Sequence, residues 1–363
     1  MIATILVLLV ILATMAVFYW KASLVTMLTT ILSAIFASIV AFTYYEIVGN
    51  LCISKGWLTG WIHSLSFLIL FFLTLFLLRI LSDFIINSKI DLGNTVQIVS
   101  TVVCGLFAGL LIAGHLLIAL SMLPISPGLY LRYPPGQPLR MNDPSAPLLN
   151  PDGLSTSLYA WISRGSLSSS KSFSVFHPNF IQQTHVNRWA MAKGITPVLS
   201  PGAVKIPSGG QKPVRIKDFA NNPRTTVIRI GISAAESKSG GARDKSGNVS
   251  FLSAQIPIIT VPKGTETAGK YVGNGTLLYP KGVVENGNVT KLELNQILTF
   301  NSQAYASDRM VWLDLAYDVP SDAVPVLLTL KQNAVVELPK AVPSTEEIEK
   351  GLKPERTTPI NLQ

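Results

Sequence analysis

Charged residues are scarce in this sequence. Asp, Glu, Lys and Arg make up 13% of the chain, against roughly a quarter in a typical soluble protein. The shortage is concentrated before Pro124, where four basic and three acidic residues stand among long apolar runs and proline is missing. Few charges and no helix-breaking proline exclude an ordinary soluble domain in this part, and they are typical of membrane-embedded helices.

Cysteine is also scarce, and catalytic motifs are missing. Cys52 falls in a short predicted loop and Cys104 in a predicted membrane helix, so no disulfide is expected between them. The sequence after Pro124 has no HExxH zinc motif, no G-x-S-x-G motif and no phosphate-binding glycine-rich loop. We therefore expect no enzymatic activity, no cofactor and no metal. The net charge of +9 is spread without a dense basic block, so nucleic acid is not an expected partner.

Four apolar runs before Pro124 are each long enough to cross a lipid bilayer. A hydrocarbon core of about 30 Å needs about 20 apolar residues in a helix that rises 1.5 Å per residue. Four spans place both ends of this region on one side of the membrane, and the Lys and Arg residues of the loops do not decide which side. The predicted four-helix bundle has spans at 2–20, 24–48, 62–86 and 95–123.

Small residues line one face of the fourth span. Gly105, Gly109 and Ala113 are four residues apart and therefore share a helical face, where they form a groove that lets another helix backbone approach closely. We expect this stripe to pack helices together, either inside one chain or between copies in a homo-oligomer.

Three ionisable residues lie in the predicted spans. Arg79 and Asp83 are four apart near the end of the third span, so they either line an ion or proton path or form a local pair with a snorkelling arginine. His115 lies deeper in the fourth span and is either a proton-relay group or a neutral histidine bonded to a neighbouring helix. We favour the structural interpretation for all three.

The sequence after Pro124 divides into three parts. Residues 124–220 are rich in proline and serine and predict a linker with one short helix at 154–163. Residues 341–363 predict a disordered tail. Between them, residues 221–340 alternate apolar and polar residues between turn formers such as Asn286 and Gly287, as an all-β, immunoglobulin-like β-sandwich would. The predicted strands lie at 225–233, 254–261, 276–279, 292–300, 310–317 and 324–330.

Residues 1–125 resemble the colicin V production protein family, the CvpA-like membrane proteins of bacteria. The resemblance depends on a short first hairpin around Tyr19, Trp20 and Lys21, a helix ending in Arg79, an amphipathic link at 86–94 and a glycine-rich last span. The proline-rich exit and the sequence from Tyr159 to Ser168 resemble the longer members of the family.

The resemblance implies an inner-membrane protein linked to toxin or bacteriocin production or to envelope homeostasis, with no established catalysis. Some relatives have an extracytoplasmic serine protease after the four spans, which implies an extracytoplasmic C-terminal part here. This sequence has no Gly-Asp-Ser-Gly-Gly-like stretch, so protease activity is not expected. We expect a membrane anchor for a β domain that binds an envelope protein or polymer. The alternative is a small transporter or export component that uses His115, Arg79 and Asp83.

Overall fold

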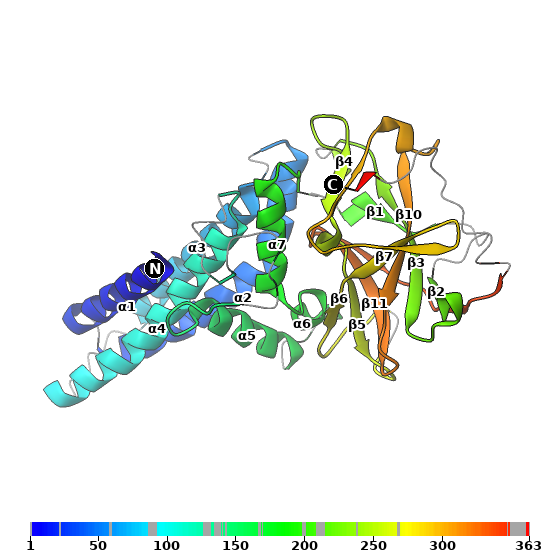
Figure 1. The fold of residues 1–363 in the computed structure, drawn as a ribbon. Helices are drawn as coiled ribbons and strands as arrows, with labels where there is room; N and C mark the ends of the chain where they lie inside the picture. Colours follow the sequence, from blue (N-terminus) through cyan, green and yellow to red (C-terminus); the bar gives the residue numbers. More distant parts are fainter. Residues whose placement is uncertain are drawn as a thin grey trace. The chain divides into compact units, whose positions relative to one another are not determined.

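In the computed structural model the chain folds into two compact units (Figure 1). Unit 1 comprises Met1–Cys52, Gly60–Gly136 and Arg140–Trp161, and unit 2 comprises Ile53–Thr59, Gln137–Leu139 and Ile162–Gln363. The structure describes residues 2–362 except for 22, 58–59, 86–92, 126–131, 134–138, 140, 142–143, 166–167, 169, 198–200, 208–214, 237–238, 267–268, 347 and 349–360.

Four long apolar helices make up most of unit 1, and each is long and apolar enough to cross a membrane. The predicted spans are confirmed as helices, although the second continues beyond residue 48 to Ser54. Unbroken runs of Leu, Ile, Phe and Ala favour helix here because no proline interrupts the backbone hydrogen bonds. The helices are α1 (Ile2–Lys21), α2 (Leu24–Ser54), α3 (Ile62–Ile85) and α4 (Asn94–Met122).

Unit 2 is rich in β-structure, as predicted, and its described strands form three sheets. The largest has the order β13-β2-β3-β10-β7-β8 with β1 also paired to β3, and the others have the orders β12-β11-β5-β6 and β14-β9-β4. Its immunoglobulin-like arrangement stays a prediction. The strands are β1 (Val204–Lys205), β2 (Arg215–Lys217), β3 (Thr225–Ser233), β4 (Val249–Leu252), β5 (Ile258–Pro262), β6 (Thr276–Leu278), β7 (Pro280–Glu285), β8 (Asn288–Lys291), β9 (Ile297–Phe300), β10 (Met310–Asp318), β11 (Ala323–Leu330), β12 (Ala334–Glu337), β13 (Val342–Pro343) and β14 (Asn361–Leu362).

One apolar core is shared by residues of all three sheets. Ile230 on β3, Phe251 on β4 and Leu328 on β11 belong to the same buried cluster. Successive side chains of a strand point to opposite faces, so β3 turns Ile228, Ile230 and Ile232 to this core. Its other face holds Val227, which lies in a second buried cluster. The central strands of the large sheet are therefore buried on both faces.

The region from 124 to 220 is more structured than predicted. The short helix expected at 154–163 is α5 (Pro151–Arg164). Two further helices, α6 (Phe173–Phe176) and α7 (Phe180–Ala192), replace the expected linker. Both helices belong to unit 2, as do the strands β1 and β2 that follow them. The prediction of a linker failed because α7 buries mostly polar residues, which gave no apolar helical stripe in the sequence.

The C-terminal tail, predicted to be disordered, contributes strands where it is described. Strand β13 pairs in parallel with β2, the backbone N–H of Ser344 donates to the carbonyl oxygen of Lys217 at 3.0 Å, and Ile348 packs on the second cluster. Strand β14 pairs with β9. The rest of the predicted disordered segment lies outside the described residues.

Candidate functional site

The small-residue stripe of α4 faces α1. A Cβ atom added to Gly105 would lie 2.8 Å from Cγ of Met15, and one added to Gly109 would lie 2.8 Å from Cα of Ile11. Ala113 continues the stripe in a buried cluster with residues of α1. Backbone contact this close is possible only because the stripe lacks larger side chains. Its place in the structure is thus the packing of two helices within one chain.

Arg79 and Asp83 form an ion pair on α3, with 2.8 Å between Nη2 and Oδ1. The side chains are 29% and 57% exposed. The pair joins neighbouring turns of one helix and leaves most of the carboxylate on the surface of unit 1. This geometry suits a local partner for an arginine that reaches toward the membrane interface.

His115 lies apart from that pair, at the centre of an aromatic cluster inside unit 1. Its ring is fully buried and stacks on Phe71 with ring centres 3.9 Å apart and on Phe67 at 5.4 Å. The hydroxyl of Ser64 donates to the carbonyl oxygen of Ala119, and this bond together with the Phe71–His115 contact shows that α3 and α4 run antiparallel. Arg79 is eight residues beyond Phe71, or about 12 Å along α3. The structure therefore does not bring the three predicted polar residues together.

The imidazole of His115 has one bonded and one unbonded nitrogen. Nδ1 lies 2.7 Å from the carbonyl oxygen of Leu111, one helical turn away. Among the described residues, Nε2 has no hydrogen-bond partner. The predicted bond to a neighbouring helix is thus replaced by a bond within α4. Because the Leu111 carbonyl oxygen can only accept, Nδ1 carries the proton and Nε2 of the neutral ring is an acceptor. An unpartnered buried acceptor is costly, and Nε2 can take up a proton or bind a small donor group.

The polar face of α5 is turned toward α4 next to His115, at Gly114. The buried residues of its first two turns are mostly polar, whereas Trp161 is 66% exposed. The N-terminus of α5 packs against Gly114, where an added Cβ would collide with the Pro151 carbonyl oxygen and the Ser155 hydroxyl. That hydroxyl has no partner among the described residues. Asp152, Ser155 and Thr156 are the buried polar residues of these two turns, and Tyr159 is buried on the same face in the next turn.

Tyr159 connects α5 to the aromatic cluster through α2. Its ring stacks on Phe42 with centres 4.7 Å apart, and Phe42 in turn lies 5.6 Å from the ring of His115. The Tyr159 hydroxyl lies 2.7 Å from Oγ1 of Thr43. Burial raises the pKa of Tyr159, so its hydroxyl stays neutral and acts as a hydrogen-bonding group. We call Phe42, Thr43, Phe67, Phe71, His115, Ser155 and Tyr159 the polar-aromatic centre.

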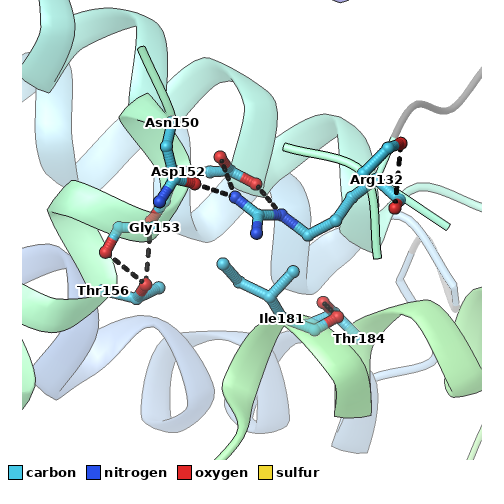
Figure 2. Close-up of polar contacts among 8 residues, drawn as sticks. Arg132, Asn150, Asp152, Gly153, Thr156, Ile181 and Thr184 are labelled. Carbon is cyan, nitrogen blue, oxygen red and sulfur yellow. Dashed lines mark hydrogen bonds and ion pairs between the residues drawn. The ribbon is translucent and has the colours of Figure 1, made fainter. Parts of the chain in front are cut away.

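A buried ion pair holds the start of α5 in place (Figure 2). Arg132 donates from Nε to Oδ2 of Asp152 at 3.0 Å and from Nη2 to Oδ1 at 2.8 Å. Arg132 also donates to the side-chain oxygen of Asn150. Asp152 lies in the first turn of the helix, where a carboxylate is favoured by the helix dipole. This two-pronged contact orients the helix that presents Ser155 and Tyr159.

Sequence reasoning missed the contribution of α5 to this centre. Asp152, Ser155, Thr156 and Tyr159 follow the three- and four-residue spacing of one helical face. This spacing predicts that the four side chains share one face of a helix, but a polar helical face normally points to solvent. Only the tertiary structure places it in the interior.

The centre contains no metal-binding constellation. Among the residues that the structure describes, no three His, Cys, Asp or Glu side chains come together as ligands. Comparison with known proteins adds no identity: no family model, no curated protein and no solved structure matches this chain.

Proposed function

We propose that this chain is a non-enzymatic, multi-pass bacterial membrane protein of the colicin V production type, in which the helices of unit 1 anchor a β unit that binds an envelope partner. The family assignment rests on the sequence pattern described above. From the same resemblance we infer an inner-membrane protein with its β unit outside the cytoplasm and a role in toxin production or envelope homeostasis.

The observation that supports the anchor most directly is the apolar outer surface of the four helices. Many of their large apolar side chains are more than half exposed, and Leu9, Phe76 and Val103 are each at least 60% exposed on different helices. In water such a continuous surface would drive association. In a bilayer the same side chains contact lipid at no cost, while the polar-aromatic centre stays inside.

The observation that supports a binding role for the β unit is its independent core. Its three sheets share one buried cluster made entirely of unit 2 residues. A unit with its own core can fold beside the membrane and present surface loops to a partner. Binding requires only such a stable scaffold, whereas no catalytic constellation was found in the sequence.

Fractionation and protease accessibility test this proposal. The full chain is expected to stay in the membrane fraction after carbonate washing and to need detergent for extraction. In spheroplasts, added protease is expected to remove the β unit while leaving a membrane-protected fragment. Recovery in plain buffer would refute the anchor, and cleavage only after lysis would refute the extracytoplasmic placement. Crosslinking in intact membranes would then identify the partner.

A second candidate function, a small transporter or export component, is favoured by one observation. Nε2 of His115 and Oγ of Ser155 are both buried and without a partner among the described residues. Such groups suit a path for protons or small polar molecules. In this case His115→Ala abolishes secretion or toxin tolerance at normal protein levels, whereas Arg79→Ala, in the exposed ion pair, has little effect. An unchanged phenotype for His115→Ala would refute the transport role.

A further inference from the structure

Helix α5 has the opposite polarity to that of an ordinary surface helix. An amphipathic helix in water buries its apolar side chains and exposes its polar ones. In α5 the polar residues Asp152, Ser155 and Thr156 are buried. The residues that stay exposed or half-buried follow the three- and four-residue spacing of the opposite side of the helix. This outer face is mostly apolar and consists of Leu154, Ser157, Leu158 and Trp161.

The turn that leads into α5 also exposes apolar side chains, those of Leu148 and Leu149. Leu149 and Asn150 have φ values of 59° and 47°, a region that residues other than glycine rarely adopt. The backbone N–H of Asn150 donates to the carbonyl oxygen of Pro147 at 2.9 Å, and that of Leu154 donates to the carbonyl oxygen of Asn150 at 2.9 Å. Strain that the surroundings maintain in this way is frequent at binding sites.

The contacts between α1 and α4 show how deep in the bundle α5 begins. Gly109 of α4 meets Ile11 of α1, and the two helices run antiparallel. Gly114, five residues further along α4, is therefore level with Leu6, about 6 Å from the first residue of α1. The Pro151 carbonyl oxygen and the Ser155 hydroxyl of α5 pack against Gly114, so the first turns of α5 lie at this level.

Helix α1 in turn indicates where the hydrocarbon core of a bilayer would end. Its 20 residues are about 30 Å long, which matches the thickness of that core. Ile2 and Ile5 are exposed in its first turns, so its apolar surface extends to its first residue. The start of α5 consequently lies about 6 Å inside the edge of the core.

The next part of α5 lies at nearly the same depth. Tyr159 stacks on Phe42, whose ring centre is 5.6 Å from that of His115, the neighbour of Gly114 in α4. Both ends of the segment from Ser155 to Tyr159 therefore pack at the level of the same turn of α4. The helix runs across the bundle, along the plane of the membrane.

From this geometry we propose that α5 is an additional membrane element, an in-plane helix whose outer face contacts lipid acyl chains next to the headgroups. The proposal rests on the membrane anchor proposed above, and the outer face continues the apolar surface of the four spans. Helices of this kind lie about 5–10 Å into the boundary between headgroups and acyl chains, which agrees with the depth of α5. Tryptophan is enriched at this boundary, as Trp161 would be. The ion pair of Arg132 with Asp152 is shielded, since these side chains are 12% and 2% exposed.

Quenching by brominated lipid tests the position of Trp161 in the full chain. The protein and its variant Trp161→Phe are reconstituted in vesicles of three parts phosphatidylcholine to one part phosphatidylglycerol, with or without bromine near the top of one acyl chain. The difference between the two proteins gives the fluorescence of Trp161. We expect brominated lipid to lower it at least twofold and iodide in the water to leave it unchanged. Fluorescence that brominated lipid does not quench would overturn the proposal, whether or not iodide quenches it.

Spin labels in the same vesicles separate the placement of α5 from the anchor itself. With the native cysteines removed as Cys52→Ser and Cys104→Ala, one label is attached at Ser157→Cys on the outer face. Leu9→Cys on the exposed face of α1 is the lipid control, and Gln303→Cys on the exposed surface of the β unit is the water control. The Ser157→Cys label is expected to be at least threefold more accessible to oxygen than to a water-soluble nickel chelate, as the Leu9→Cys label is.

The outcomes of the labelling experiment are distinct. Nickel access to the label on α5 alone would refute its contact with lipid and leave the anchor intact, whereas nickel access to the label on α1 as well would refute both. Dipolar broadening between α5 labels of neighbouring chains would show that a second copy covers the outer face, and it would also overturn the proposal. Serine and cysteine differ by one atom, so the variant that carries the label on α5 is expected to fold normally.

Discussion

The buried ion pair between Arg229 and Asp314 allows a quantitative test of what stabilises the β unit. The two residues are directly opposite each other on β3 and β10. Arg229 donates from Nε to Oδ1 at 2.8 Å and from Nη2 to Oδ2 at 2.6 Å, and the side chains are 3% and 4% exposed. Asp314→Ala leaves the guanidinium buried without its carboxylate. We expect the free energy of unfolding of unit 2 to fall by about 3–5 kcal/mol.

The same two strands supply a matched control. Arg224, just before β3, pairs with Asp318 at the end of β10 at 2.9 Å, but these side chains are 61% and 47% exposed. Water already solvates both charges, so Asp318→Ala is expected to cost less than about 1 kcal/mol. The two pairs share residue types and strands and differ in burial and in the number of hydrogen bonds, two for Arg229 and one for Arg224.

Hydrogen exchange of β3 amides in detergent measures both variants on one scale. The double variant Arg229→Met with Asp314→Leu removes both charges, and it is expected to recover most of the stability that Asp314→Ala loses. Equal small losses for Asp314→Ala and Asp318→Ala would show that the Arg229–Asp314 pair is not desolvated in the folded protein, and the argument from burial would then be wrong.

Three further perturbations test other parts of the structure. Gly109→Leu is expected to separate α1 from α4, because the added Cβ would meet the Ile11 backbone. It should therefore lower the melting temperature in detergent, whereas Val103→Leu, on the exposed face of α4, should leave the melting temperature unchanged. Burial lowers the pKa of Lys331 to about 7, so between about pH 7 and 10.5 the folded state binds fewer protons than the unfolded state. The free energy of unfolding should therefore rise with pH in this range. Urea titrations of Lys331→Met should lack this rise. Tyr159→Phe removes the bond to Thr43 and should cost about 0.5–1.5 kcal/mol in detergent melts.

The elements that the sequence predicts well are those whose pattern reflects burial directly. The four apolar runs are helices, and the alternation from Thr225 to Ser233 matches β3 at both ends. The turn formers Asn286 and Gly287 do turn the chain between β7 and β8, with φ values of 52° and 81°. Strand β8 itself was not predicted, because all four of its residues are exposed and show no apolar alternation.

Another part of the structure is not predicted because it buries polar residues. The buried residues of helix α7 include Gln183, His185 and Arg188. No periodicity of apolar residues in the sequence identifies such a helix. The same holds for the inward face of α5. Of the predicted site residues, the small stripe of α4 could be placed because close helix contact needs only small side chains. The surroundings of His115 could not be predicted from the sequence, because they combine residues of α2, α3 and α4.

The surroundings of His115 limit what its unpartnered nitrogen can bind. Around His115 the partners are aromatic rings and a backbone carbonyl, so only a proton or a very small polar molecule could pair with the free nitrogen.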